Sequence, residues 1–140
     1  MKVFLDTNVL VSALATRGLC ADLLRKVLTE HELLVGEQVL IECRRVLRSK
    51  FRLPKDLLDD IDQFLRAQTI VSKGAAGLDV TVRDPDDARI IAEAVAGSAD
   101  VLVTGDRDLL DLAAHSPVRI VNPRGFWELS LVEQTHRQSL

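Results

Sequence analysis

The sequence is poor in cysteine and in long apolar runs. Its two cysteines, Cys20 and Cys43, lack Cys-x-x-Cys spacing, so we expect small buried apolar side chains rather than a disulfide framework or a structural zinc site. No window approaches the roughly 18 consecutive apolar residues of a membrane-spanning helix, which excludes membrane insertion. Asp6 interrupts the opening apolar stretch too early for a signal peptide, which favours the cytoplasm.

The chain also lacks an excess of positive charge. Its 18 Lys and Arg residues face 21 Asp and Glu, a net charge of −3, so the overall basic field of a passive nucleic-acid binder is missing. RNA could still be bound through a local patch, or phosphates through metal ions held by carboxylates. The 140 residues suit one domain with its own core, expected at 1–134 before a disordered tail at 135–140.

Short apolar segments alternate with helical patterns along the chain. Strands are expected at 2–5, 33–35, 69–71, 101–103 and 118–121, and helices at 9–14, 20–28, 38–50, 55–66, 85–96, 109–114 and 126–131. The strands are too short and too continuously apolar to be half solvated. This pattern predicts a three-layer α/β/α fold around a parallel sheet of about five strands.

Carboxylates follow two of the expected strands. Asp6 comes directly after the first strand, and Asp106 follows the strand at 101–103 after a Thr-Gly step. In open α/β sheets, ligands bind beyond the carboxyl ends of the strands. Both acids are therefore expected at the same edge of the sheet.

Further acids could join this edge from two helices. Asp84, Asp86 and Asp87 open the helix at 85–96, which is approached by a short apolar segment at 80–82. Glu42 lies at the border of the apolar face of the helix at 38–50. Three or four carboxylates without cysteine or histidine partners form an all-oxygen site, which suits Mg²⁺ or Mn²⁺ rather than Zn²⁺.

Such sites usually carry out phosphoryl-transfer chemistry, and the spacing does not choose between a nuclease and a phosphatase. Each acid also has a structural alternative. Asp6, Asp84 and Asp106 could cap helices, Asp86 and Asp87 could complement a helix dipole, and Glu42 could form a salt bridge. The role of Asp108 is left open. The histidines His31, His115 and His136 fall in turns or the tail without a paired partner and are interpreted as surface residues.

Basic residues gather in one segment of the chain. Six of the twelve positions from 44 to 55 are Lys or Arg, namely Arg44, Arg45, Arg48, Lys50, Arg52 and Lys55. The run is either a solvated face or a contact with RNA phosphates beside the acids, with Arg44, Arg45 and Arg48 as the candidates.

Four features, in order and correctly spaced over nearly the whole chain, resemble a PIN domain. They are "VFLDTNVLVSAL" from position 3, the helix acid Glu42, "DPDDARIIAEAVAGSADVLVTGDRDLL" from position 84 and "VNPRGFWEL" from position 121. The resemblance is nearest to the bacterial toxin components of toxin–antitoxin systems, the VapC group. The chain departs from compact VapC toxins in having "TGDRDLL" where those often carry an Asn followed by Asp-Phe.

The resemblance implies a sheet order of 3-2-1-4-5 and an endoribonuclease that depends on Mg²⁺ or Mn²⁺. It also implies a homodimer with a cognate antitoxin. The catalytic, metal-binding acids of the family match Asp6, Glu42, Asp87 and Asp106. Thr7 and Asn8 match the polar pair that positions the first acid, Thr104 a hydroxyl near the metal, and Asp108 an auxiliary acid.

Two other functions stay open. The first is a PIN module that binds RNA or protein without catalysis, and metal-dependent cleavage of single-stranded RNA would separate it from a nuclease. The second is a receiver-like signalling domain, which needs an acidic pair after its first strand and a phosphoacceptor Asp after its third. Here Asp6 is a single acid, and Val71 is followed by Ser72 and Lys73.

Overall fold

Five parallel strands form one sheet in the order β3-β2-β1-β4-β5, as expected from the resemblance. The computed structural model describes residues 1–71 and 85–138. The strands are β1 (Lys2–Leu5), β2 (Glu32–Gly36), β3 (Thr69–Val71), β4 (Val101–Val103) and β5 (Arg119–Val121). The central β1 is buried from Val3 to Leu5, which explains its unbroken apolar sequence.

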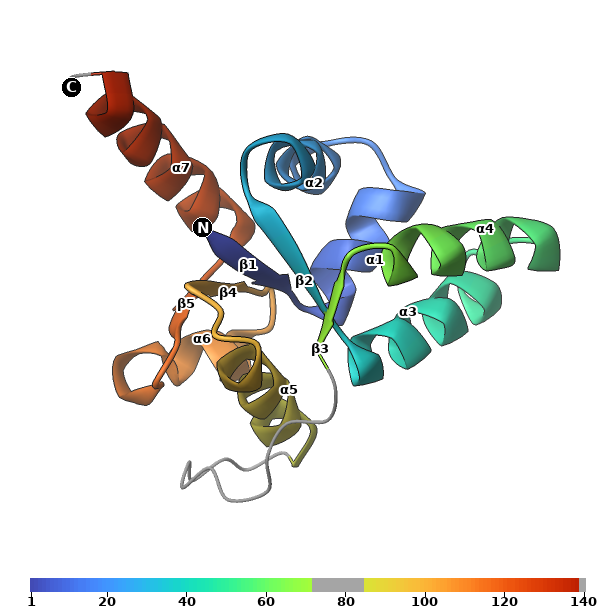
Figure 1. Ribbon diagram of the computed structural model, residues 1–140. Coiled ribbons are helices and arrows are strands. Elements are labelled where there is room, and N and C mark those ends of the chain that lie inside the picture. Colours follow the sequence, from blue (N-terminus) through green and yellow to red (C-terminus); the bar gives the residue numbers. More distant parts are fainter. Residues whose placement is uncertain (72–84, 139–140) are drawn as a thin grey trace.

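Helices cover both faces of this sheet and complete the three expected layers. They are α1 (Thr7–Ala15), α2 (Leu19–Glu30), α3 (Glu37–Ser49), α4 (Lys55–Arg66), α5 (Pro85–Ala96), α6 (Arg107–Asp111) and α7 (Pro123–Gln138), with a 3₁₀ turn at Ala113–His115. Figure 1 shows α5 on one side of the sheet and α2 with α7 on the other. Within the described part of the chain, no helix is both long and apolar enough to cross a membrane.

The helix α7 is longer than the turn or two expected at 126–131. Its start is set by Asn122, whose side-chain Oδ1 accepts a hydrogen bond of 2.7 Å from the backbone N–H of Gly125. Its backbone continues to Gln138 and so includes residues 135–138 of the segment expected to be a tail. Apolar periodicity identifies only the part of a helix that packs on a core, and Leu131 and Val132 are already exposed.

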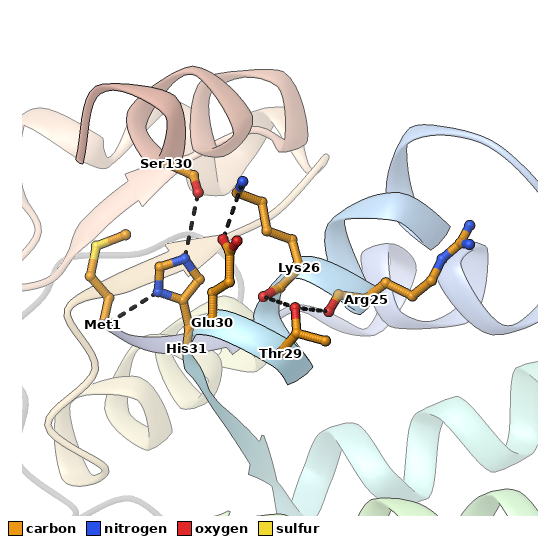
Figure 2. A network of polar contacts seen from close by, with 7 residues as sticks. All are labelled: Met1, Arg25, Lys26, Thr29, Glu30, His31 and Ser130. Atoms are coloured by element: carbon orange, nitrogen blue, oxygen red, sulfur yellow. Dashed lines mark hydrogen bonds and ion pairs between the residues drawn. The ribbon is translucent and has the colours of Figure 1, made fainter. Parts of the chain in front are cut away.

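His31, predicted from the sequence to be a surface residue rather than a ligand, is half-buried and has polar partners. Its half-buried ring lies between the N-terminus and α7 (Figure 2): Nδ1 is 3.2 Å from the Met1 amine, and Nε2 is 3.5 Å from Ser130 Oγ. The ring also meets Phe126 edge-on, with centroids 5.8 Å apart. These partners are distant in sequence, so residue spacing alone could not reveal them.

The two cysteines are free, as expected. Cys43 is buried, and this burial raises the pKa of its thiol to about 12. Cys20 is half-buried and packs against the core. Both therefore act as apolar packing groups.

Candidate acidic site

Asp6 is the first residue beyond β1 and caps the helix that follows. Its side-chain Oδ1 accepts a hydrogen bond of 2.7 Å from the Thr7 backbone N–H, and its Oδ2 accepts one of 2.7 Å from the Thr104 hydroxyl. Its own N–H donates to the carbonyl oxygen of Val103, at 2.9 Å, which extends the pairing of β1 with β4. The sheet therefore fixes the Asp6 backbone, while the Thr7 N–H and the Thr104 hydroxyl orient its carboxylate.

The surroundings of Asp6 work against its ionised form. Asp6 is 6% exposed, and burial raises the pKa of its carboxyl more than any other effect does. The hydrogen bonds from Thr104 and Thr7 lower this pKa in part, while the charges of Asp106 and Glu42 raise it further. A nearby cation would relieve this destabilisation.

Three more carboxylates lie together next to this position. One carboxylate oxygen each from Asp87, Asp106 and Asp108 lies within 4.8 Å of the others. Asp87 is buried in the first turn of α5, and Asp106 caps α6 by accepting a 2.8 Å hydrogen bond from the Asp108 N–H. The Asp106 N–H donates to the Thr104 hydroxyl oxygen at 3.0 Å, so Thr104 connects this group to Asp6.

Glu42 reaches the same place from α3. Its Oε2 accepts a hydrogen bond of 2.8 Å from the Thr7 hydroxyl, and its Oε1 accepts one of 3.1 Å from the Gln38 side-chain amide. Thr7 therefore binds two acids at once, Asp6 through its backbone N–H and Glu42 through its hydroxyl. We call Asp6, Glu42, Asp87, Asp106 and Asp108 the acidic site.

The structure thus brings the four acids of the PIN resemblance into one connected group. Asp108, expected as an auxiliary acid, belongs to the tightest part of it. Asn8 is exposed in the first turn of α1, and within the described residues it donates no hydrogen bond to these carboxylates, so only Thr7 of the expected pair contacts them. Asp84 and the side chain of Asp86 lie outside the described residues.

Capping and membership of the site are not exclusive. The sequence also allows Asp6 and Asp106 to act as helix caps, and both accept backbone hydrogen bonds at helix starts. A carboxylate that accepts one hydrogen bond still has lone pairs for another ligand. The two roles therefore coexist on the same side chains.

The donor set fits a hard divalent cation. Carboxylates, together with the Thr104 hydroxyl, are the ligand type of Mg²⁺ and Mn²⁺. Ligand oxygens across an octahedral Mg²⁺ are separated by about 4 Å. The Asp87, Asp106 and Asp108 oxygens all lie within 4.8 Å of one another, so small side-chain adjustments would let them contact one cation.

Two residues next to the site were not identified from the sequence, Gln38 and Glu93. Gln38 donates to Glu42 through its side chain, and its backbone N–H donates to Glu93 Oε1 at 3.2 Å. The signal for Glu93 is an acid within the otherwise apolar run of α5, three residues after Ile90 and beside Ala94. Such an acid is rarely buried without a specific partner.

The predicted basic residues line a groove between α3 and α4. The groove has a volume of about 310 Å³ and is lined by Leu40, Ile41, Arg44, Arg45, Arg48, Asp62 and Arg66. Arg44 forms an ion pair of 2.7 Å with Asp59. Arg45 and Arg48 are exposed on the same helix that carries Glu42.

Comparisons with known proteins agree with the fold described above. Residues 2–108 match the family model described as PIN domain. The solved structure described as VapBC2 from Rickettsia felis, bound to a DNA fragment from their promoter, contains a chain of similar fold. The TM-score is 0.61 at 22% identity, covering 87% of this chain and 98% of that one. No curated protein matches the chain in sequence. Because the family model spans most of the sequence, the chain belongs to the PIN domain family.

Proposed function

We propose that this protein is an endoribonuclease dependent on Mg²⁺ or Mn²⁺ that hydrolyses RNA phosphodiester bonds as the toxin of a toxin–antitoxin pair. The observation that carries the proposal is the acidic site, in which hydroxyls and amides hold buried carboxylates against their mutual repulsion. Membership of the PIN domain family supports nuclease chemistry. The likeness to VapC toxins and the VapBC2 neighbour support the toxin assignment.

Asp87, Asp106 and Asp108 would hold the cation, together with Asp6 and Glu42. A bound divalent ion at such a site activates water and neutralises charge on the phosphate oxygens. The residues of the chain contribute orientation: Thr104 fixes Asp6 and the start of α6 through one hydroxyl. Glu42, held by Thr7 and Gln38, has lone pairs left to orient an attacking water.

The decisive experiment is a metal titration. We expect Mn²⁺ or Mg²⁺ to raise the melting temperature, because the ions bind the folded site and not the unfolded chain; at a hundredfold excess over Kd the gain is about 2.7 kcal/mol. Single-stranded RNA should be cleaved with Mg²⁺ or Mn²⁺, and Zn²⁺ should not support comparable activity. Asp106→Asn serves as the control that loses both the stabilisation and the cleavage.

Two results would contradict the proposal. Full cleavage in excess chelator would exclude the metal-dependent mechanism. RNA binding without cleavage at any concentration of these ions would indicate a non-catalytic PIN module instead.

The groove between α3 and α4 supports a contact with the RNA backbone. We expect Arg45→Ala and Arg48→Ala each to weaken RNA binding and to reduce the log–log salt slope by about 0.7, the value for one single-strand phosphate contact. Arg44→Ala should change the slope less, because Asp59 already neutralises much of that charge.

The matched control is Arg124→Ala on α7, where the guanidinium is highly exposed and forms an ion pair with Glu128 on the same helix. Filter binding from low to high salt measures the slopes of the parent and of the four variants. Equal slopes for parent, Arg45→Ala and Arg48→Ala would assign the groove to a solvated face.

The proposal includes a cognate antitoxin protein and a homodimer as partners. The antitoxin is proposed from the VapC likeness and from the neighbouring structure, a complex named VapBC2. Apolar side chains exposed on α4 outside the groove, Leu57 at 42% and Phe64 at 40%, agree with a protein partner on that helix. Light scattering tests the homodimer. Co-purification of this protein with the co-expressed antitoxin tests that partner.

A further inference from the structure

The helix α3 begins without a capping side chain of its own. It follows β2 directly, and its N-cap residue is Gly36, which has no side chain to accept a hydrogen bond. The first backbone N–H groups of a helix need acceptors when they are shielded from water. Here the Gln38 N–H donates to Glu93 Oε1 at 3.2 Å, and Glu93 lies on α5, 55 positions later.

Glycine at position 36 is explained by the same contact. Its φ of −77° is open to any residue, so the backbone does not demand glycine. A Cβ at this position would instead overlap Glu93 Oε2 and approach the Phe4 ring to 2.9 Å. The end of β2 is therefore shaped around the Glu93 carboxyl.

Keeping a carboxyl at this place is costly for the fold. Glu93 is 1% exposed, and within the described residues its Oε2 has no hydrogen-bond partner. Burial is the main cause that raises its pKa to about 7, while the hydrogen bond from Gln38 acts in the opposite direction. An aliphatic side chain would fill the same space without this penalty, so packing alone does not account for the residue.

The contacts beyond Gln38 lead into the acidic site. The Gln38 side-chain amide donates to Glu42 Oε1 at 3.1 Å, and the Thr7 hydroxyl donates to Glu42 Oε2 at 2.8 Å. Glu93 thus reaches Glu42 through a single intermediate residue. It also stands on α5, whose first turn carries Asp87.

From this connection we infer that Glu93 is a positioning residue of the acidic site, which fixes the start of α3, and through Gln38 the carboxylate of Glu42, relative to Asp87 on α5. The inference deepens the proposed function and rests on it. The side chain acts through Gln38 rather than on the cation or the RNA. The alternative is a buried helix cap whose loss lowers stability without affecting the site.

Three conservative variants separate these roles. Glu93→Gln keeps the length and an oxygen acceptor for the Gln38 N–H. Glu93→Asp keeps the carboxyl but shortens the side chain by one methylene, which withdraws the acceptor from Gln38. Ile91→Val is the matched control, because it removes one methylene from a fully buried residue of α5.

We expect Glu93→Asp to weaken Mn²⁺ binding, measured by calorimetry, by about tenfold, the lower end of the range for residues that orient metal ligands. Glu93→Gln and Ile91→Val should bind Mn²⁺ as the parent does. The NMR resonance of the Glu42 carboxyl carbon in metal-free protein should shift in Glu93→Asp and not in the other two. Gln38→Met, which keeps the backbone donor and removes the side-chain donor, should reproduce both changes even if Glu93→Asp does not fold.

The inference is overturned if Glu93→Asp matches Ile91→Val in Mn²⁺ affinity and in the Glu42 resonance, or if Gln38→Met leaves both at parental values. These outcomes are independent of the proposed nuclease. A parent protein that binds Mn²⁺ and cleaves no RNA overturns the proposed function, while the affinity series still decides the inference. If the parent binds no Mn²⁺, the Glu42 resonance alone decides it.

Discussion

Asp6→Asn should lower the rate of RNA cleavage by at least about a thousandfold, the scale seen when a member of a cooperating catalytic group is removed. In the same variant, the free energy of unfolding in metal-free buffer should equal or exceed that of the parent. The asparagine amide oxygen can still accept the hydrogen bond from the Thr7 N–H, so the cap of α1 is kept. The Thr104 hydroxyl can rotate to accept from the new amide nitrogen.

The expected gain in stability follows from the direction of the Asp6 pKa shift. Burial raises this pKa above its unfolded value of 3.8, so the folded state favours the protonated acid. The contribution of Asp6 to stability is greatest below that value and is lost as the pH rises through the folded pKa. The asparagine side chain does not ionise. The difference in the free energy of unfolding between Asp6→Asn and the parent should therefore grow in favour of the variant from acidic to neutral pH.

Chemical denaturation at several pH values, beside a cleavage assay, measures both effects. Asp60→Asn, on the exposed face of α4, is the control with the same change of charge and should match the parent in both assays. A melting temperature of Asp6→Asn well below the parent's would make Asp6 a structural cap. Parental cleavage would remove it from the catalytic group.

Glu42→Gln combined with Asp87→Asn should be hardly slower than the worse single variant. Glu42 is bound to Thr7, Thr7 to Asp6, and Asp6 through Thr104 to Asp106, whose carboxylate lies next to Asp87. Residues that act as a unit lose most of their joint effect when any one is removed. If each single variant is about a hundredfold slower, the double variant should also be about a hundredfold slower, rather than ten thousandfold.

Single-turnover cleavage rates of the single and double variants with saturating Mn²⁺ measure the coupling between Glu42 and Asp87. The control pair combines Asp87→Asn with Glu128→Gln, an exposed acid on α7, and its losses should simply multiply. Multiplying losses in the Glu42 and Asp87 pair would mean that the two acids act independently. Parental activity of Glu42→Gln would exclude Glu42 from the site.

The sequence predicts the sheet and most of the acidic site for a simple physical reason. Short apolar strands that are buried on both faces are visible as runs, and residues just after parallel strands meet at one edge. Asp6 and Asp106 could be placed in this way. Glu42 could be placed by its position at the border of an apolar helix face, and the PIN resemblance added the strand order.

The remainder depends on contacts that have no local signature. Glu93 and Gln38 are in contact although 55 positions separate them in the sequence. No residue near Gly36 in the sequence indicates that the Glu93 carboxyl fills the space beside this glycine. The contacts of His31 could not be predicted for the same reason, because its partners are Met1 and a residue of α7. Residue spacing does not decide the role of Asp108, because one side chain in the first turn of a helix can face either solvent or a neighbouring carboxylate.

The strand order determines when, during translation, the acidic site can form. β1 lies at the centre of the sheet, yet one of its two neighbours, β4, arrives about a hundred residues later, and the hydrogen bond from Thr104 to Asp6 spans 98 positions. Contacts so distant in sequence form late, because the loop must close before they are gained. A growing chain therefore carries Asp6, and from residue 42 onward also Glu42, before Thr104, Asp106 or Asp108 has been added. If the protein is the nuclease proposed above, its acidic site is completed only after the last third of the chain has emerged and docked, so an unfinished chain would not cleave RNA on its own ribosome.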